Sequence, residues 1–274
     1  MCDLDGCGAH KEMPPIIIPD EQRRAFLKGL AALPLAAVLF DPVLARAQAD
    51  TVEMIEIDMP GGAPVKGALA LPDAENAPAL LLVHEWWGLN DQIKSVAAEF
   101  AKLGFIAFAI DLFDAEPATT PDGAMALIKG LDPEVATKKL VTAIDWLKNN
   151  PHGNGKVGTI GWCFGGGWSL NASLATPVDA TVIYYGNVAK TADELKALKG
   201  PVLGNFGTLD QNINKDMVAG FEAAMKEAGK ADDLTVNWYT ADHGFANPTS
   251  ARYDAEDTAA AWDVTLAFLK KNLG

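Results

Sequence analysis

One cysteine lies in a sequence pattern that could make it a nucleophile. The run 156–160 is rich in β-branched and small residues and predicts a buried strand, which leads into Gly161-Trp162-Cys163-Phe164-Gly165-Gly166. This is the strand–turn–helix pattern G-x-S-x-G, with cysteine in the position of serine. The turn is sharp, so the glycines two residues either side of Cys163 are needed where a Cβ would collide with the strand or helix. The sulfur would then face a helix N-terminus, whose unpaired N–H groups favour a thiolate and can hold an oxyanion.

Three further groups could work with this thiol, because each follows directly on a predicted strand: Glu85, Asp210 and His243. The carboxyl ends of parallel strands share one edge of an open α/β sheet, and ligands bind at that edge. His243 could take the proton of Cys163 and later activate water, while Asp210 could fix the imidazole tautomer. The order nucleophile, acid, histidine along the chain is that of the α/β-hydrolases.

Each of these groups also has an ordinary structural explanation. Cys163 could be a buried cysteine in a glycine-rich turn, and Asp210 could cap a helix. Glu85 could be a solvated loop carboxylate, and His243 could simply be exposed. The chain has four histidines, of which only His243 follows the last predicted strand. The complete pattern therefore favours the catalytic interpretation.

The elements that must position these groups alternate between strands and helices. Residues 51–58 and 65–71 predict an antiparallel hairpin at the sheet edge. Further strands are expected at 79–83, 105–110, 156–160, 180–185, 201–206 and 234–239. Helices are expected at 93–103, 122–130, 132–149, directly after the elbow, 191–198, 214–228 and 255–271. This alternation predicts an α/β fold with a mostly parallel, doubly wound sheet and helices on both faces. Together with the order of the candidate residues, it points to the α/β-hydrolase fold.

Length and charge limit the possible functions. The chain has 274 residues, 49% of them hydrophobic, which suffices for one large α/β domain at residues 50–274. Its formal net charge of −14 argues against nucleic acid and anionic membrane as partners. We expect a monomer that acts on a small-molecule ester or lactone, with no cofactor and no metal.

Residues 1–49 are predicted to be an export signal that precedes the fold. The segment 22–28 carries a twin-arginine pair, an apolar run covers 29–40, and small-residue cleavage sites end at Ala47 or Ala49. The apolar run is well short of the roughly 20 residues that span a bilayer, so we expect no stable membrane anchor. The alternative is an amphipathic helix that stays attached. The partner would be the twin-arginine export machinery, and the location the periplasm.

The cysteine count depends on this signal. Cys2 and Cys7 lie before the twin arginines and would leave with the signal. Cys163 would then be the single cysteine of the mature protein, unable to form an internal disulfide. The spacing of Cys2, Cys7 and His10 matches no standard zinc pattern.

Four motifs surround the candidate residues: Gly161-Trp162-Cys163-Phe164-Gly165-Gly166, His84-Glu85-Trp86-Trp87-Gly88, Gly207-Thr208-Leu209-Asp210 and Asp242-His243-Gly244-Phe245. At these motifs the sequence resembles the dienelactone hydrolase (carboxymethylenebutenolidase) family, from Val52 to the C-terminus.

The resemblance implies a role for each matching residue. Cys163, His243 and Asp210 would form a catalytic triad. Glu85 would hold or accept the thiol proton in the resting enzyme and move away when substrate binds. The backbone N–H groups of Phe164 and Trp86 would form the oxyanion hole.

The sequence also departs from the family pattern in the residues that would contact substrate. Family members that cleave dienelactones hold the substrate carboxylate with arginines, but here Asn247 follows His243 by four positions and the loop 111–114 carries no arginine. Arg252 is the nearest basic candidate, or else a solvated charge. Aromatic side chains could wall an apolar pocket: Trp86, Trp87, Trp162 and Phe245, whereas Trp168 is expected to pack in the core.

The sequence therefore predicts an exported hydrolase that cleaves an activated ester or lactone through a thioester on Cys163. Two alternatives stay open. The first is a broader exported thiol esterase that acts on aryl or sugar esters. The second is a binding protein on a hydrolase scaffold, in which Cys163 is unreactive.

Overall fold

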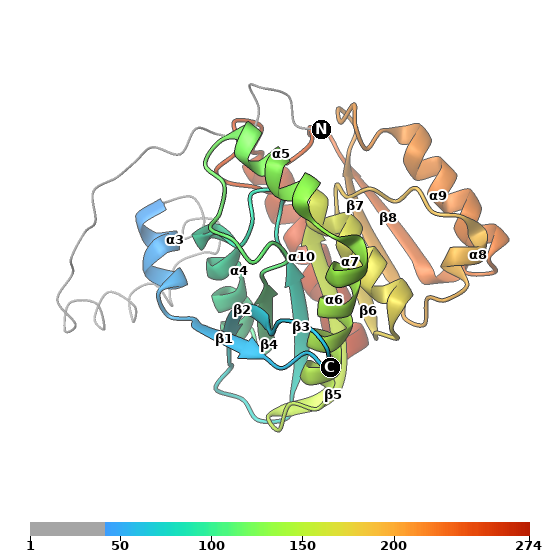
Figure 1. The fold of residues 1–274 in the computed structure, drawn as a ribbon. Coiled ribbons are helices and arrows are strands. Elements are labelled where there is room, and N and C mark those ends of the chain that lie inside the picture. Colours follow the sequence, from blue (N-terminus) through green and yellow to red (C-terminus); the bar gives the residue numbers. More distant parts are fainter. Residues whose placement is uncertain (1–41) are drawn as a thin grey trace.

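The structure, a computed structural model, describes residues 42–274, and these build one eight-stranded sheet (Figure 1). In spatial order the strands are β1 (Glu53–Ile57), β2 (Val65–Ala70), β4 (Ile106–Ile110), β3 (Ala77–Val83), β5 (Gly153–Trp162), β6 (Ala180–Tyr184), β7 (Val202–Gly207) and β8 (Leu234–Tyr239). β2 is antiparallel to β1 and β4, and all other neighbours are parallel. The expected edge hairpin and the mostly parallel sheet are confirmed. The twin-arginine segment, Cys2, Cys7 and His10 lie outside the described residues.

Helices cover both faces of the sheet, as the continuous apolar strands require. α4 (Asp91–Lys102) and α10 (Ala255–Leu273) pack on one face, and α6 (Pro133–Lys148), α7 (Phe164–Ala175) and α9 (Lys215–Glu227) on the other. Successive side chains of a strand point to opposite faces. In β3, Leu80 and Leu82 accordingly join the cluster with α4, whereas Leu81 and Val83 join the cluster with α6. The sheet is thus buried on both sides and holds its carboxyl edge rigid.

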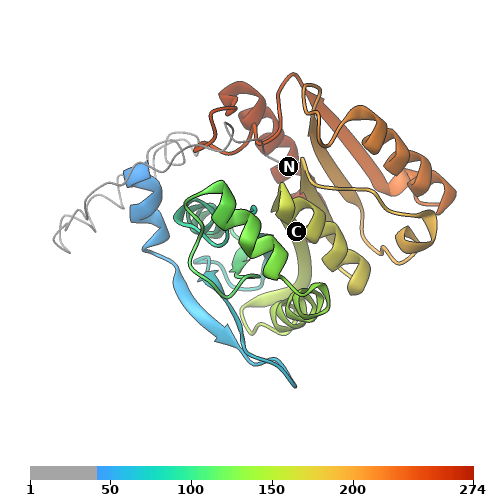
Figure 2. The ribbon, with the colours of Figure 1, turned by 45° about the horizontal axis from the view of Figure 1, so that its top comes forward.

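The remaining helices are short. α5 (Pro121–Gly130) lies at the carboxyl edge of the parallel strands, in front of the sheet edge in Figure 2. α8 is a single turn (Ala192–Leu195), shorter than the helix expected at 191–198. It ends early because i→i+3 bonds, such as Leu198 N–H to the Leu195 carbonyl, tighten the chain before it enters β7. No helix in the described part of the chain has the length and apolarity needed to cross a membrane.

α3 (Pro42–Ala49) packs against α4 and contains the residues of both expected cleavage sites. Ala45 and Ala49 are buried in this contact, and so is Gln48. The Gln48 amide donates a hydrogen bond to the buried Glu99 carboxylate of α4. The catalytic domain assigned to residues 50–274 is therefore in contact with residues that precede it.

The turn after β5 brings backbones together too closely for any side chain. Cys163 has φ 53° and ψ −116°, a left-handed backbone that is costly for a residue with a Cβ. A Cβ on Gly161 would lie 2.0 Å from the Gly165 carbonyl oxygen, and one on Gly165 would lie 2.2 Å from that of Val83. Glycine at these two positions is a steric condition for the elbow.

Gly161→Ala should therefore lower the free energy of unfolding by about 3 kcal/mol or more, because backbone rather than a flexible side chain blocks the new methyl group. The matched control is Gly220→Ala on α9, where a Cβ meets nothing within 4 Å. That change should stabilise the protein by up to about 1 kcal/mol, since alanine favours a helix. Urea unfolding of both variants measures the difference, and equal stabilities would show that the elbow tolerates a side chain.

His84 ties the loop after β3 to the loop after β4. The Leu112 N–H donates to His84 Nε2 (3.2 Å), so His84 Nδ1 carries the hydrogen and donates to the Glu85 carbonyl (2.6 Å). This pair of bonds requires a neutral imidazole. Burial, with a smaller contribution from the charge of Lys139, outweighs the backbone hydrogen bonds that oppose it and lowers the pKa of His84 from 6.5 to about 4.

Stability should consequently fall as the pH drops from 6.5 towards 4, because the unfolded chain binds a proton at His84 that the folded chain excludes. The loss should reach about 2 to 3 kcal/mol by pH 4.5. Denaturant unfolding from pH 7 to 4.5 measures it against His84→Gln, which keeps a donor and an acceptor but does not titrate. His152→Gln, at an exposed turn, is the control. A pH dependence that persists unchanged in His84→Gln would contradict this assignment.

Candidate active site

The elbow presents Cys163 at the carboxyl edge of the sheet. Cys163 follows β5, and its N–H donates to the Tyr184 carbonyl at the end of β6 (3.0 Å). It also occupies the N-cap of α7, where the first N–H groups of the helix lack partners within the helix. The thiol is half-buried and forms no disulfide. This environment suits a sulfur that becomes negatively charged.

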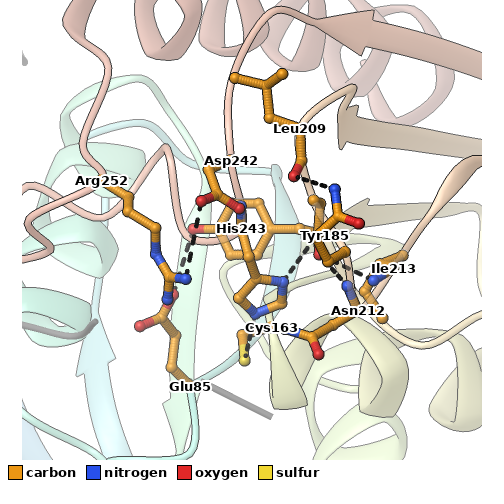
Figure 3. A network of polar contacts seen from close by, with 11 residues as sticks. Glu85, Cys163, Tyr185, Leu209, Asn212, Ile213, Asp242, His243 and Arg252 are labelled. Atoms are coloured by element: carbon orange, nitrogen blue, oxygen red, sulfur yellow. Dashed lines mark hydrogen bonds and ion pairs between the residues drawn. The ribbon is translucent and has the colours of Figure 1, made fainter. Parts of the chain in front are cut away.

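His243 and Asp210 complete a chain of polar contacts with the thiol, and Figure 3 shows the contact between Cys163 and His243. His243 Nε2 lies 3.1 Å from Cys163 Sγ, and His243 Nδ1 lies 2.7 Å from Asp210 Oδ2. Asp210 follows β7 and His243 follows β8, and both side chains are buried. The structure thus brings together three residues that are far apart in the sequence, at the distances that nucleophile, base and orienting acid require.

The Asp210 carboxylate is held from two sides. Its Oδ1 accepts hydrogen bonds from the backbone N–H groups of Asn212 (2.8 Å) and Ile213 (2.9 Å), while Oδ2 faces His243. Burial raises the pKa of Asp210, but the hydrogen bond and charge of His243, with the two N–H donors, outweigh it and leave the pKa below its usual value. An ionised Asp210 can accept the Nδ1 hydrogen and stabilise the imidazolium.

Glu85 is buried at the same edge but makes different contacts. Its Oε2 accepts a hydrogen bond from the Asn247 amide (2.6 Å), and its Oε1 accepts one from the Tyr185 hydroxyl (3.3 Å). Burial raises the pKa of Glu85, and both hydrogen bonds oppose this rise only in part. The resemblance implies a contact between Glu85 and the thiol, whereas in this structure the thiol contacts His243.

The two expected oxyanion-hole residues flank the nucleophile. Phe164 is the first residue of α7, so its N–H lies at the open end of that helix. Trp86 follows β3 by three residues, and β3 pairs directly with β5. The elbow lies so close to the end of β3 that a Cβ added to Gly165 would be only 2.2 Å from the Val83 carbonyl oxygen. The backbones of Phe164 and Trp86 therefore belong to one small region.

The aromatic side chains expected to wall a pocket are buried. Phe245 is fully buried against Tyr184, Tyr185 and Tyr239 and forms part of the core. Trp87 is 4% exposed and packs with Trp86 beneath α5 (ring centroids 4.9 Å apart). Trp162 also belongs to the core. Trp168, which was expected to pack in the core, is partly buried against it. These rings support the loops of the site, and their faces are covered by protein.

Arg252 lies beside the site on the loop after β8 (Figure 3). Its guanidinium is 3.9 Å from the Asp242 carboxylate, and its charge acts on the buried Glu85. The expected basic residue is therefore paired with the Asp242 carboxylate and acts on Glu85 only through its charge. Within residues 42–274, no cluster of three His, Cys, Asp or Glu side chains could hold a metal ion.

Sequence reasoning did not identify two residues of the site. Tyr185 directly follows β6, with φ 36°, and its position after a parallel strand was the signal that could have found it. Its ring also packs edge-on against His243 (centroids 5.2 Å apart). The sequence showed only that Asn247 stands where family members have an arginine. Its hydrogen bond to Glu85 joins distant loops and is visible only in the structure.

Comparisons with known proteins agree with this geometry. The family model of the dienelactone hydrolase family matches residues 65–273. Protein usf of Aquifex pyrophilus is 31% identical, over 81% of this chain and 99% of its own length. Carboxymethylenebutenolidase 1 of Cupriavidus pinatubonensis is 25% identical, over 78% of this chain and 95% of its own length.

The fold has close structural counterparts as well. The crystal structure of a promiscuous phosphotriesterase of dienelactone hydrolase type, from metagenomic libraries, superimposes with a TM-score of 0.74 at 24% identity. The match covers 82% of this chain and 99% of the other. The chain therefore belongs to the dienelactone hydrolase family of α/β-hydrolases and is an ester or lactone hydrolase.

Proposed function

We propose that this enzyme hydrolyses an activated ester or lactone through a thioester on Cys163. The single observation that carries the proposal is the contact chain from Cys163 Sγ through His243 to Asp210, with distances of 3.1 and 2.7 Å. A histidine that contacts both a thiol and a buried carboxylate can move the proton of the sulfur and keep the imidazole oriented.

The first half of the reaction forms the acyl-enzyme. His243 Nε2 takes the thiol proton as the sulfur attacks the carbonyl carbon. The N–H groups of Phe164 and Trp86 bind the resulting oxyanion. When the tetrahedral intermediate collapses, the carbon–oxygen bond to the leaving group breaks and His243 returns the proton to that oxygen. The product of this half is a thioester and a released alcohol, enol or phenol.

The second half regenerates the enzyme. His243 Nε2 removes a proton from water, which attacks the thioester carbonyl. The oxyanion forms at the same N–H groups, and the carbon–sulfur bond then breaks. The thiolate takes the proton from His243, and the carboxylic acid product leaves. Because a thiolate leaves more readily than an amine, amides should be poor substrates, whereas esters with stable leaving groups should react well.

The residues near the site favour a neutral ester over an anionic lactone as substrate. Asn247 is a neutral amide that binds Glu85, and Arg252 is already paired with the Asp242 carboxylate. A broader thiol esterase that acts on aryl or sugar esters is therefore the second candidate. Rates of hydrolysis of a dienelactone and of p-nitrophenyl acetate separate the two: a clear preference for the anionic dienelactone would exclude the broader esterase.

We also propose that the enzyme is exported to the periplasm by its twin-arginine segment. The support is the order of segments 22–28 and 29–40 followed by small residues. Changing Arg23 and Arg24 to lysine should leave the enzyme in the cytoplasm of a bacterial host, measured by cell fractionation. N-terminal sequencing of exported protein gives the cleavage position, and a periplasmic protein that starts at Met1 would refute cleavage.

Cys163→Ala should reduce the hydrolysis of p-nitrophenyl acetate to near the uncatalysed rate, a loss of at least about a thousandfold in kcat/KM. The variant removes only the sulfur, so its urea unfolding should match that of the parent within about 1 kcal/mol. Mass spectrometry of the parent, quenched with acid during turnover, should show an acyl group on Cys163. A variant that retains full activity would rule out the thioester route.

A further inference from the structure

Glu85 is a buried carboxylate beside a nucleophilic thiol, yet it is held away from that thiol. Glu85 is 5% exposed, and its two oxygens are occupied by separate donors, Asn247 Nδ2 at 2.6 Å and the Tyr185 hydroxyl at 3.3 Å. Cys163 contacts His243 Nε2 instead. Tyr185 and His243 both interact with Glu85 and with Cys163, so the carboxylate and the thiol belong to one cluster.

The Asn247 side chain is itself fixed in the orientation that presents a donor to Glu85. Its Oδ1 accepts hydrogen bonds from the Thr249 N–H (2.9 Å) and the Thr249 hydroxyl (2.7 Å). These two donors identify Oδ1 as the oxygen, so the opposite atom is the NH₂ group that faces Glu85. The Asn247 N–H also bonds to the Gly244 carbonyl (3.0 Å), which fixes the backbone. The side-chain amide of Asn247 is therefore held in one orientation, with Thr249 on its oxygen and Glu85 on its nitrogen.

We propose that Asn247 is a positioning residue that clamps the Glu85 carboxylate away from Cys163 and so leaves the thiol paired with His243 before substrate binds. The chemical consequence rests on the proposed function, because a thiol already paired with its base needs no carboxylate movement before attack. An ionised Glu85 that turned towards the sulfur would oppose formation of the thiolate, since like charges disfavour each other.

Removing the clamp should have a defined effect on the thiol. Asn247→Leu keeps the approximate volume but removes the donor, which leaves Glu85 Oε2 buried without its partner. Glu85 can regain a hydrogen bond by turning towards the thiol. Besides Tyr185, the charged or titratable groups that act on Glu85 are His243 and Arg252, and Cys163 acts on Tyr185; the substitution leaves all of them in place.

The test measures alkylation of Cys163 by iodoacetamide against pH, followed by mass spectrometry of the peptide that carries Cys163 in the full chain. Proteins to compare are the parent, Asn247→Leu, Glu85→Gln and the double variant. In the parent background, Asn247→Leu should move the midpoint of the rate–pH curve up by roughly one pH unit and slow alkylation at pH 7 about tenfold. In the Glu85→Gln background, the same substitution should change the rate less than twofold, because no carboxylate remains to be positioned.

Two results would overturn the inference: an unchanged rate in Asn247→Leu, or an equal slowing in both backgrounds, which would mean that Asn247 acts on packing alone. Asn247→Asp is the second variant if Asn247→Leu does not fold, because it keeps the shape and the acceptor for Thr249 but loses the donor. Asn272→Leu on α10, at the opposite edge of the sheet, is the matched control and should leave the curve unchanged. The measurement uses no ester, so loss of the clamp is distinguishable from failure of the thioester route, which Cys163→Ala tests.

Discussion

The site depends on the close approach of three backbone segments around Cys163. The end of β3, the elbow and the first turn of α7 meet so tightly that a Cβ at Gly161 or Gly165 would lie 2.0 or 2.2 Å from a carbonyl oxygen. Parallel pairing of β3 with β5 and of β5 with β6 imposes this approach, and burial on both faces stabilises the pairing. The left-handed backbone of Cys163 is therefore maintained by the whole sheet, and the thiol is placed by it.

Two carboxylates at this edge have opposite environments. Asp210 accepts two backbone N–H groups and faces His243, so its pKa stays below the usual value although burial opposes this. Glu85 has two neutral donors, and burial raises its pKa. Groups with pKa values pushed apart can take different tasks in one site. The first suits a permanent charge that supports an imidazolium, and the second suits a carboxyl group that can take up a proton without leaving its place.

The strands, and the convergence of Cys163, His243 and Asp210, could be predicted from the sequence because both follow from local rules. Apolar runs that end in Glu85, Cys163, Asp210 and His243 fix these residues at one edge whatever the details of packing. Contacts between loops follow no such rule. The hydrogen bond from Asn247 to Glu85 joins residues 162 positions apart. Phe245 is buried against three tyrosines from other segments of the chain. α8 is shorter than the helix expected at 191–198, because the chain tightens into i→i+3 bonds before it enters β7.

The loop after β4, residues 111–114, supplies no positive charge of its own to an anionic substrate. Asp111 accepts hydrogen bonds from the N–H groups of Phe113 and Asp114, which closes the loop on itself. Behind it, the buried Lys139 binds Asp114 Oδ2 (2.5 Å) and the Leu112 carbonyl (3.3 Å). The positive charge of Lys139 is thus neutralised inside the protein. If Lys139 were separated from Asp114, its ammonium would be a buried charge without its ionic partner. A substrate carboxylate that approached this loop would meet carboxylates and amides. No positive charge would then compensate for the hydration that the substrate carboxylate loses.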